Sequence, residues 1–269
     1  MTAPLDGRLL MVGCGNMGGA MLRRWLECGL MPAQVTVVSP SGRALPPGVT
    51  VLRGLPAESD ADVVLLALKP QQLGALAGSP LAGYAPALLV SILAGVDAAR
   101  LASLSRAVAV VRAMPNLPVA LGKGVVMLQS DDADNAARAE AERLMAPLGL
   151  VEWSDAARFD ALAALSGCGP AFLFRFVDAL ADAGVALGIE PAQAARLALA
   201  TVEGGAALAA GEERSPATLA DAVASPGGMT RAGLDVLDHD EALRRLLRET
   251  LSAAARRGGE LAEVSARPG

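Results

Sequence analysis

RLLMVGCGNMG, residues 8–18, decides the fold of the first half of this chain. A short apolar run ends at Gly13, three glycines follow with the spacing G-x-G-x-x-G, and an alanine- and leucine-rich helical stretch comes next. The glycine spacing alone is a weak match, but strand, glycine turn and helix in this order open a dinucleotide-binding βαβ unit. An ordinary glycine-rich turn between a strand and a helix is the alternative.

Each glycine has a predicted role in such a loop. Gly13 permits the tight turn, Gly15 lets a pyrophosphate approach the backbone, and Gly18 lets the helix pack closely against the strand. The pyrophosphate then lies on the free N–H groups and positive end of the helix that begins near Asn16.

The composition is that of a folded, acidic protein. The chain has 269 residues, 53% hydrophobic and 19% charged, and its length is typical of about two domains. A net charge of −5 lacks the basic footprint of a nucleic-acid-binding protein. The three cysteines form no CxxC motif or Cys/His cluster, so neither a disulfide framework nor a metal site is indicated. No apolar run approaches the roughly 18 residues of a membrane span, and the N-terminus lacks a signal-peptide core. We therefore expect no membrane partner and a cytoplasmic location.

The apolar pattern changes near residue 153. Before it, Val-, Ile- and Leu-rich runs alternate with helical stretches, which predicts a Rossmann domain with a doubly wound, mostly parallel sheet over residues 1–153. After it, strand patterns disappear, which predicts an all-α domain over residues 154–269. Expected strands are 9–12, 35–38, 63–67, 88–92, 108–111 and 125–128, and expected helices are 17–28, 133–146, 157–188, 191–210, 215–224 and 229–263. These helices carry more apolar surface than one small bundle covers, which predicts packing against a second subunit, with a monomeric helical cap as the alternative.

The end of the second expected strand bears on the choice of cofactor. In NAD-selective sheets an Asp or Glu at this point accepts hydrogen bonds from the ribose 2′-hydroxyl. Here Val38 is followed by Ser39-Pro40-Ser41-Gly42-Arg43, which has hydroxyls and a guanidinium for a 2′-phosphate and no carboxylate to repel it. This favours NADPH, with NADH as the alternative. A turn whose Ser and Arg side chains are only solvated is the other interpretation.

Four further segments are more specific than generic loops. Residues 67–71 and 112–118 each follow an expected strand, at the carboxyl end where open α/β sheets bind ligands. Residues 166–170 are expected to interrupt a helical region, and residues 225–230, Ser-Pro-Gly-Gly-Met-Thr, to open a new helix. The glycines of that helix start expose consecutive N–H groups that can bind a small carboxylate, with the Thr230 hydroxyl beside it. A helix start that only caps itself is the alternative.

In their order and spacing, GCGNMG, LALKPQ, SILAGV, RAMPNLP, SGCGPAF and SPGGMT resemble the pyrroline-5-carboxylate reductase family, from residue 8 to residue 263. The resemblance implies an N-terminal Rossmann domain and a helical domain that interlocks with its partner in a homodimer, often assembled further into a ring. It implies reduction of the cyclic imine 1-pyrroline-5-carboxylate to L-proline with NAD(P)H, in proline biosynthesis. It also implies that each site lies between the Rossmann domain and the helical dimer and draws on two subunits.

The resemblance also assigns roles to individual residues. The implied cofactor contacts are Gly13, Cys14, Gly15, Asn16, Met17 and Gly18 at the pyrophosphate, Ser39, Pro40 and Ser41 at the adenosine ribose, Leu68, Lys69 and Pro70 along the groove, and Ala94 and Gly95 near the nicotinamide. The implied substrate-binding residues are Glu213, Gly227, Gly228, Met229 and Thr230, with Thr230 also catalytic. The chain departs from the family pattern at Leu117, Cys168, Ala222 and Met229, which leaves its fine substrate and cofactor preference open.

Two other functions stay open. One is a related NADPH-dependent reductase of another small imino or keto acid, for which the changes at Cys168 and Met229 are the expected mark. The other is a nucleotide-binding regulator without turnover, and the retained Thr230 argues against it.

In imine reduction the cofactor supplies the hydride, so the protein needs few acid–base side chains. This agrees with a chain that has one histidine, His239. Catalysis is then expected to come chiefly from orienting the substrate.

Overall fold

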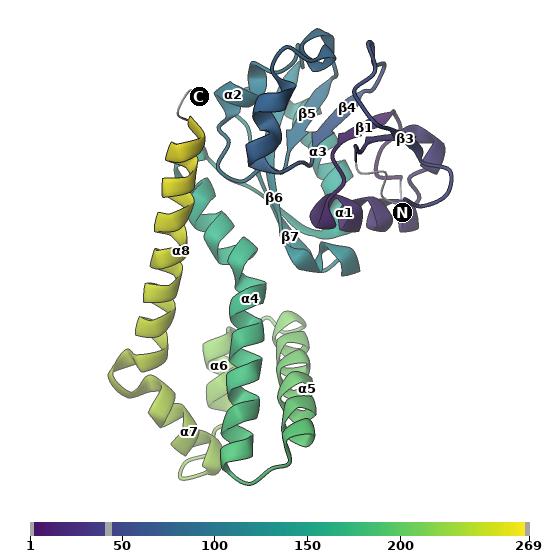
Figure 1. Cartoon of the computed structure of the whole chain (residues 1–269). Helices are drawn as coiled ribbons and strands as arrows, with labels where there is room; N and C mark the ends of the chain where they lie inside the picture. The colour runs from purple at the N-terminus through teal and green to yellow at the C-terminus, as the bar shows by residue number, and fades with distance from the viewer. Residues whose placement is uncertain (1–2, 41–44, 267–269) are drawn as a thin grey trace. The chain divides into compact units, whose positions relative to one another are not determined.

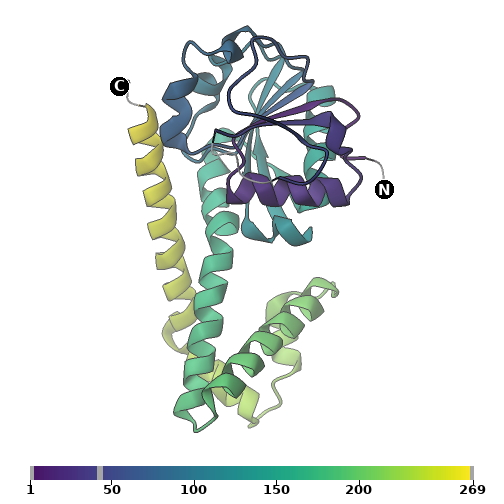
Figure 2. The ribbon, with the colours of Figure 1, turned by 45° about the vertical axis from the view of Figure 1, so that its right-hand side comes forward.

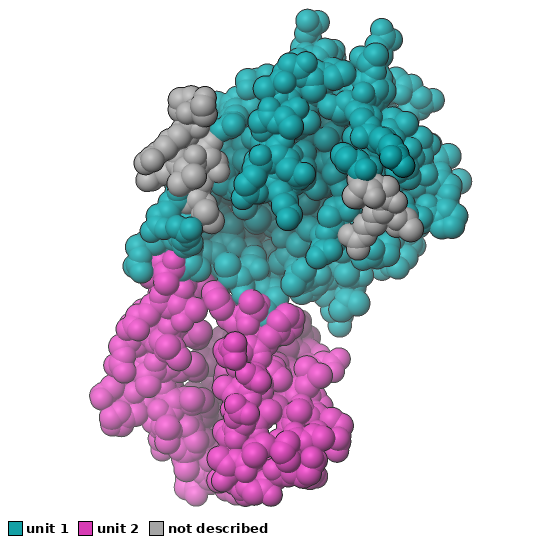
Figure 3. All heavy atoms as spheres, in the orientation of Figure 1, with its two compact units in different colours: residues 1–170, 254–269 teal, residues 171–253 magenta. Residues whose placement is uncertain are grey.

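The computed structural model describes residues 3–40 and 45–266, with the backbone alone for residues 261–266. The chain forms two compact units, residues 1–170 with 254–269 and residues 171–253, which Figure 3 shows in different colours. The first unit holds the sheet, and the second is built from helices. The predicted division between residues 153 and 154 falls in the short link between the last strand and the helix after it.

The first unit is built on one sheet of eight strands in the order β3-β2-β1-β4-β5-β6-β7-β8. Neighbouring strands run parallel except β6 and β7, which are antiparallel. This arrangement confirms the predicted doubly wound, mostly parallel sheet (Figure 1). The strands are β1 (Leu9–Val12), β2 (Val35–Val38), β3 (Thr50–Leu52), β4 (Val63–Leu66), β5 (Leu88–Ser91), β6 (Ala109–Pro115), β7 (Gly124–Gln129) and β8 (Gly149–Trp153).

The two edge strands, β3 and β8, are missing from the sequence prediction. β3 has only three residues, and its Thr50 and Val51 are exposed. In β8 the side chain of Leu150 is exposed as well. An edge strand buries less surface than a central strand, so its sequence lacks the continuous apolar run by which the central strands are identified.

Alternate residues of the strands enter two separate cores, because successive side chains of a strand point to opposite faces of the sheet. In β1, Leu9 and Met11 join one core, while Leu10 and Val12 join the other. Figure 2 shows α1 lying along one face of the sheet. The elements over the first core are α1 (Asn16–Glu27) and α3 (Asn135–Met145), and those over the second are α2 (Ala98–Ala102) and the 3-10 helices η2 (Pro70–Leu76) and η3 (Pro80–Gly83).

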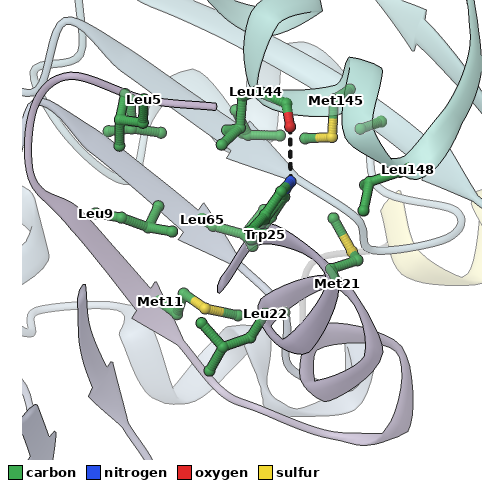
Figure 4. Close-up of a cluster of buried hydrophobic side chains, with 14 of the residues drawn as sticks. Leu5, Leu9, Met11, Met21, Leu22, Trp25, Leu65, Leu144, Met145 and Leu148 are labelled. Atoms are coloured by element: carbon green, nitrogen blue, oxygen red, sulfur yellow. Dashed lines mark hydrogen bonds between the residues drawn. The ribbon is translucent and has the colours of Figure 1, made fainter. Parts of the chain in front are cut away.

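Trp25 is the largest fully buried side chain of the first core. Its indole N–H donates a hydrogen bond to the carbonyl oxygen of Leu144 at 2.6 Å (Figure 4). Because Trp25 lies on α1 and Leu144 on α3, this bond ties together the two helices that cover the same face of the sheet. It thereby holds the helix that begins at the glycine loop.

Trp25→Phe should lower the free energy of unfolding by about 1–3 kcal/mol, because it leaves the buried Leu144 carbonyl without its indole donor. Urea denaturation followed by circular dichroism measures this loss. The matched control is Trp153→Phe, whose indole bonds to Glu142 at an exposed position and whose loss should cost less than about 1 kcal/mol. Equal losses in the two variants would contradict the role of the buried bond.

The helices after the sheet are α4 (Ala156–Ala186), α5 (Pro191–Ala210), α6 (Pro216–Ala222), α7 (Met229–Asp238) and α8 (Ala242–Ala266). They differ from the prediction in two ways. Residues 166–170 do not interrupt a helix, since α4 continues through them with Pro170 inside it. The expected helix 229–263 is two helices, because Asp240 and Glu241 have φ angles of 48° and 54°, a left-handed conformation that a right-handed helix does not continue through.

The second unit has little core of its own. The buried apolar residues within 171–253 are Ala194, Ala198 and Ala224, whereas large side chains such as Phe174 and Leu187 are exposed. Surface of this extent and kind marks a site of protein–protein or membrane contact. Among the described helices, α4 is long and apolar enough, by length and composition, to cross a membrane. The sequence led us to expect no apolar run of this length, and α4 differs from that expectation, although charged residues such as Arg175 lie within it.

Candidate active site

A groove of about 580 Å³ lies in the first unit, where the carboxyl ends of the central strands meet. It gathers the glycine loop after β1, the chain after β2 and the segment after β4, which are far apart in the sequence. The predicted cofactor residues that line it are Gly13, Cys14, Gly15, Asn16, Met17, Gly18, Ser39, Pro40, Leu68 and Lys69. The structure therefore brings most of the predicted cofactor residues to one place.

The glycine loop has the geometry that its spacing predicts. Gly13 has a φ angle of +89°, and an added Cβ would lie 2.7 Å from the carbonyl oxygen of Ala67, so only glycine fits there. At Gly18 an added Cβ would lie 3.1 Å from the Cβ of Ala67, which shows how closely α1 approaches the chain after β4. At Gly15 an added Cβ would meet no protein atom within 4 Å. That open space lies in the groove and suits a ligand that must come close to the backbone.

The N-terminus of α1 offers a site for an anion. Gly15 is the N-cap residue, no side chain caps the helix, and its first turn has no acidic residue. The backbone N–H groups at a helix start and the helix dipole attract negative charge. The start of α1 therefore suits the pyrophosphate of a dinucleotide.

The end of β2 carries a hydroxyl and no carboxylate among its described residues. Ser39 follows β2 directly, is buried, and donates its backbone N–H to the carbonyl oxygen of Leu52 at 2.8 Å. Pro40 comes next and also lines the groove. Ser41 and Arg43, which the sequence also points to, lie outside the described residues.

Some predictions do not coincide with the groove. Pro70, Ala94 and Gly95 do not line it. The residues that line it and that sequence reasoning did not place in the cofactor site are Ala67, Gln72, Ile92, Met114 and Pro115. Met114 and Pro115 belong to the segment 112–118, which the sequence places at a carboxyl end of the sheet where ligands bind, although neither residue was assigned to the cofactor. β6 runs four residues beyond its predicted end at residue 111 and so includes both of them.

The second unit contains the other predicted site residues. Gly227 has a φ angle of +70°, and Gly228 is the N-cap residue of α7, with no side chain capping the helix and no acidic residue in its first turn. The side chain of Met229 is 94% exposed, so the helix start is open to a ligand. By the same physics as at α1, this helix start can bind a carboxylate.

Two polar side chains of this unit are available to a ligand. Thr230, in the first turn of α7, is exposed and makes no hydrogen bond through its hydroxyl to another described residue. Glu213 is exposed in the link between α5 and α6. Its neighbour Glu212 pairs with Arg214 at 3.0 Å, whereas Glu213 has no ion pair among the described residues. In the described part of the chain, no group of three or more His, Cys, Asp or Glu side chains is arranged to hold a metal ion.

The fold and groove define a class of protein, and comparison with known families agrees. A glycine loop, an open helix start and strand ends around one groove are features that the dinucleotide sites of Rossmann domains share. Residues 8–95 match the family described as NADP oxidoreductase, coenzyme F420-dependent. Residues 156–261 match the pyrroline-5-carboxylate reductase dimerisation family. The protein is an oxidoreductase that uses a nicotinamide cofactor and carries a dimerisation domain.

Similar proteins extend the match over both units. The pyrroline-5-carboxylate reductase of Pseudomonas aeruginosa is 36% identical over 266 residues, covering 95% of this chain and 97% of that protein. The pea (Pisum sativum) enzyme of the same name is 34% identical and covers 93% of this chain and 94% of its own length. The structure of a pyrroline-5-carboxylate reductase from Coxiella burnetii is 30% identical, with a TM-score of 0.81 and coverage of 96% and 99%. This chain belongs to the pyrroline-5-carboxylate reductase family.

Proposed function

We propose that this protein reduces 1-pyrroline-5-carboxylate to L-proline with NADPH, in proline biosynthesis. The observation that carries the proposal is the length of the match, since a named reductase is 36% identical across 95% of this chain. That span includes the unit with the groove and the unit with the α7 helix start. The residue roles below rest on the local geometry of each unit.

NADPH is proposed to lie in the groove of the first unit, with its pyrophosphate on the start of α1 and its ribose phosphate near Ser39 and Pro40. The missing carboxylate after β2 supports NADPH over NADH. Lys69, exposed on the groove wall, adds a positive charge for the cofactor phosphates. Bound there, NADPH supplies the hydride. A relative from Plasmodium falciparum, 22% identical with a TM-score of 0.78, was solved with NADP bound.

The substrate is proposed to bind at the start of α7. Its carboxylate accepts hydrogen bonds from the backbone N–H groups that follow Gly227 and Gly228. Thr230 is proposed to donate its hydroxyl to the ring nitrogen as that atom gains a lone pair during hydride transfer, and Glu213 is proposed to contribute to the same site. Such contacts orient a small ring for reaction without a charged side chain on its carboxylate.

The reaction then needs little acid–base chemistry from the chain. The imine carbon gains the hydride, its double bond to nitrogen becomes single, and the products are proline and NADP⁺. If the iminium form binds, the nitrogen already holds its proton and no side chain has to deliver one. His239 pairs with Asp240 at the surface, where both side chains are 78% exposed, and it has no part in this scheme.

The proposal includes a cytoplasmic homodimer. The apolar surface of the second unit and the match of residues 156–261 to a dimerisation family support the dimer. Free cysteines support a reducing compartment. A ring of dimers stays a prediction from the family resemblance, and light scattering of the purified protein measures the assembly.

The direct test is consumption of NADPH with pyrroline-5-carboxylate, with proline identified by mass spectrometry. We expect proline to form in step with NADPH oxidation, and more slowly when NADH replaces NADPH. A panel of other cyclic imino acids and keto acids separates the related reductases. Oxidation with one of those alone would refute the proposed substrate. Tight NADPH binding without oxidation on any of them would indicate a regulator.

A further inference from the structure

Residues 112–118 and 166–170, two of the segments singled out in the sequence, meet inside the first unit. The side-chain amide of Asn116 donates a hydrogen bond to the carbonyl oxygen of Ser166 at 2.9 Å. Its amide oxygen accepts the backbone N–H of Val125 at 2.8 Å. Asn116 is only 6% exposed, and both of its bonds are partly buried. One side chain thus joins the end of β6 to both β7 and α4.

Pro170 explains why the carbonyl of Ser166 accepts this bond. In an α-helix the carbonyl of residue i bonds to the N–H of residue i+4, which for Ser166 is residue 170. Proline has no N–H, so inside α4 it leaves the Ser166 carbonyl without a helical donor. Asn116 supplies that donor from outside the helix. The hydrogen bond that α4 lacks at Pro170 is therefore replaced by one from Asn116, at the end of β6.

A second contact with α4 comes from Arg112 of β6, four residues before Asn116. The guanidinium of Arg112 lies over the ring of the buried Phe159, 4.3 Å from its centroid, and 3.9 Å from the carboxylate of Asp160. Phe159 and Ser166 are seven residues apart, two turns along one face of α4. Arg112 and Asn116 are four residues apart in extended chain and so share a face as well.

The stretch of β6 between these two contacts forms part of the cofactor groove. Met114 and Pro115 line that groove, and they lie between Arg112 and Asn116 in the chain. The helix held there, α4, continues past Pro170 into the second unit, which carries the residues proposed to bind the substrate. The residues that contact α4 and the residues that line the groove therefore belong to the same short stretch of chain, 112–116.

We propose that Asn116 is a positioning residue for the reduction, because it holds α4 against the strand segment that forms the groove wall. The inference rests on the proposed function. Asn116 does not touch the cofactor in this scheme, so its loss should slow turnover and leave NADPH binding intact. Its effect should also depend on Pro170, since the proline creates the unpaired carbonyl.

A double-mutant cycle tests this proposal in the full-length protein. Asn116→Ala should lower kcat for pyrroline-5-carboxylate about tenfold, as expected for an unpaired buried carbonyl. The Kd for NADPH should stay within about twofold of the wild-type value, which a general loss of structure would not allow. Pro170→Ala restores an N–H four residues after Ser166, so in that background Asn116→Ala should lower kcat less than about threefold. Pro170→Ala alone should stay near the wild-type rate.

The outcomes separate the two proposals. An inactive wild-type protein would refute the proposed function. An active wild type, with Asn116→Ala losing the same factor in both backgrounds or losing NADPH affinity in parallel with kcat, would refute the positioning role alone. If circular dichroism shows that Asn116→Ala does not fold, Asn116→Asp replaces it. Asn116→Asp keeps the acceptor for Val125 and removes the donor to Ser166, and its loss must likewise shrink in the Pro170→Ala background.

Discussion

Gly15→Val should weaken NADPH binding at least about 100-fold, which corresponds to about 2.7 kcal/mol, and should leave the protein folded. A Cβ at Gly15 meets no protein atom within 4 Å, and the backbone there is extended, with φ −73° and ψ −160°. The added methyl groups therefore cost the fold little, but they occupy the space proposed for the pyrophosphate at the start of α1. Fluorescence titration with NADPH measures the affinity, and thermal unfolding without cofactor measures the stability.

Two controls bracket this prediction. Gly13→Val should lose stability as well as binding, because Gly13 has a φ angle of +89° and its Cβ would collide with the Ala67 carbonyl. Gly54→Val also adds a side chain in open space but lies outside the groove, so it should bind NADPH normally. If Gly15→Val bound NADPH as tightly as Gly54→Val, the pyrophosphate would not lie at the start of α1.

Thr230→Ala should lower kcat about 10- to 100-fold, while the Kd for NADPH stays unchanged. The loss corresponds to one hydrogen bond of about 1–3 kcal/mol to the ring nitrogen during hydride transfer. The Thr230 side chain is exposed and unbonded to other described residues, so its truncation removes little from the fold. Steady-state kinetics with pyrroline-5-carboxylate and a separate NADPH titration measure the two effects.

Thr230→Ser is the matched control, since it keeps the hydroxyl and removes only the methyl group. It should retain most of the wild-type rate. An unchanged kcat in Thr230→Ala would remove Thr230 from the mechanism. A loss in Thr230→Ser as large as in Thr230→Ala would assign the effect to packing of the methyl group instead of the hydrogen bond.

The features that the sequence predicts well are those set by neighbouring residues. The tight turn at Gly13 and the open space at Gly15 follow from local backbone geometry, which the glycine spacing records directly. The central strands are visible because burial on both faces demands a continuous apolar run. The helix start at Gly228 is visible for a similar reason, since glycines followed by an apolar helical pattern mark it.

The features that the sequence misses depend on partners far along the chain. Pro170 predicts a break in a helix, but α4 continues through it, and Asn116, fifty residues before Ser166, bonds to the Ser166 carbonyl that the proline leaves free. β8 is missed because an edge strand exposes alternate side chains, Leu150 among them. Residues 112–118 are expected at the ligand-binding edge of the sheet, but not as part of a strand, because the pairing of β6 with β7 extends the strand to Met114 and Pro115 beyond its apolar run.

By itself, the sequence determined that a Rossmann half precedes a helical half, where the dinucleotide loop lies, and which family the motifs resemble. These follow from periodicity and from the sterics of adjacent residues, and both are local. The tertiary structure alone decided that Met114 and Pro115 line the groove and that Asn116 bonds to Ser166 of α4. Such pairings join distant segments, and their strength comes from burial and from unsatisfied polar groups that exist only once the chain is folded.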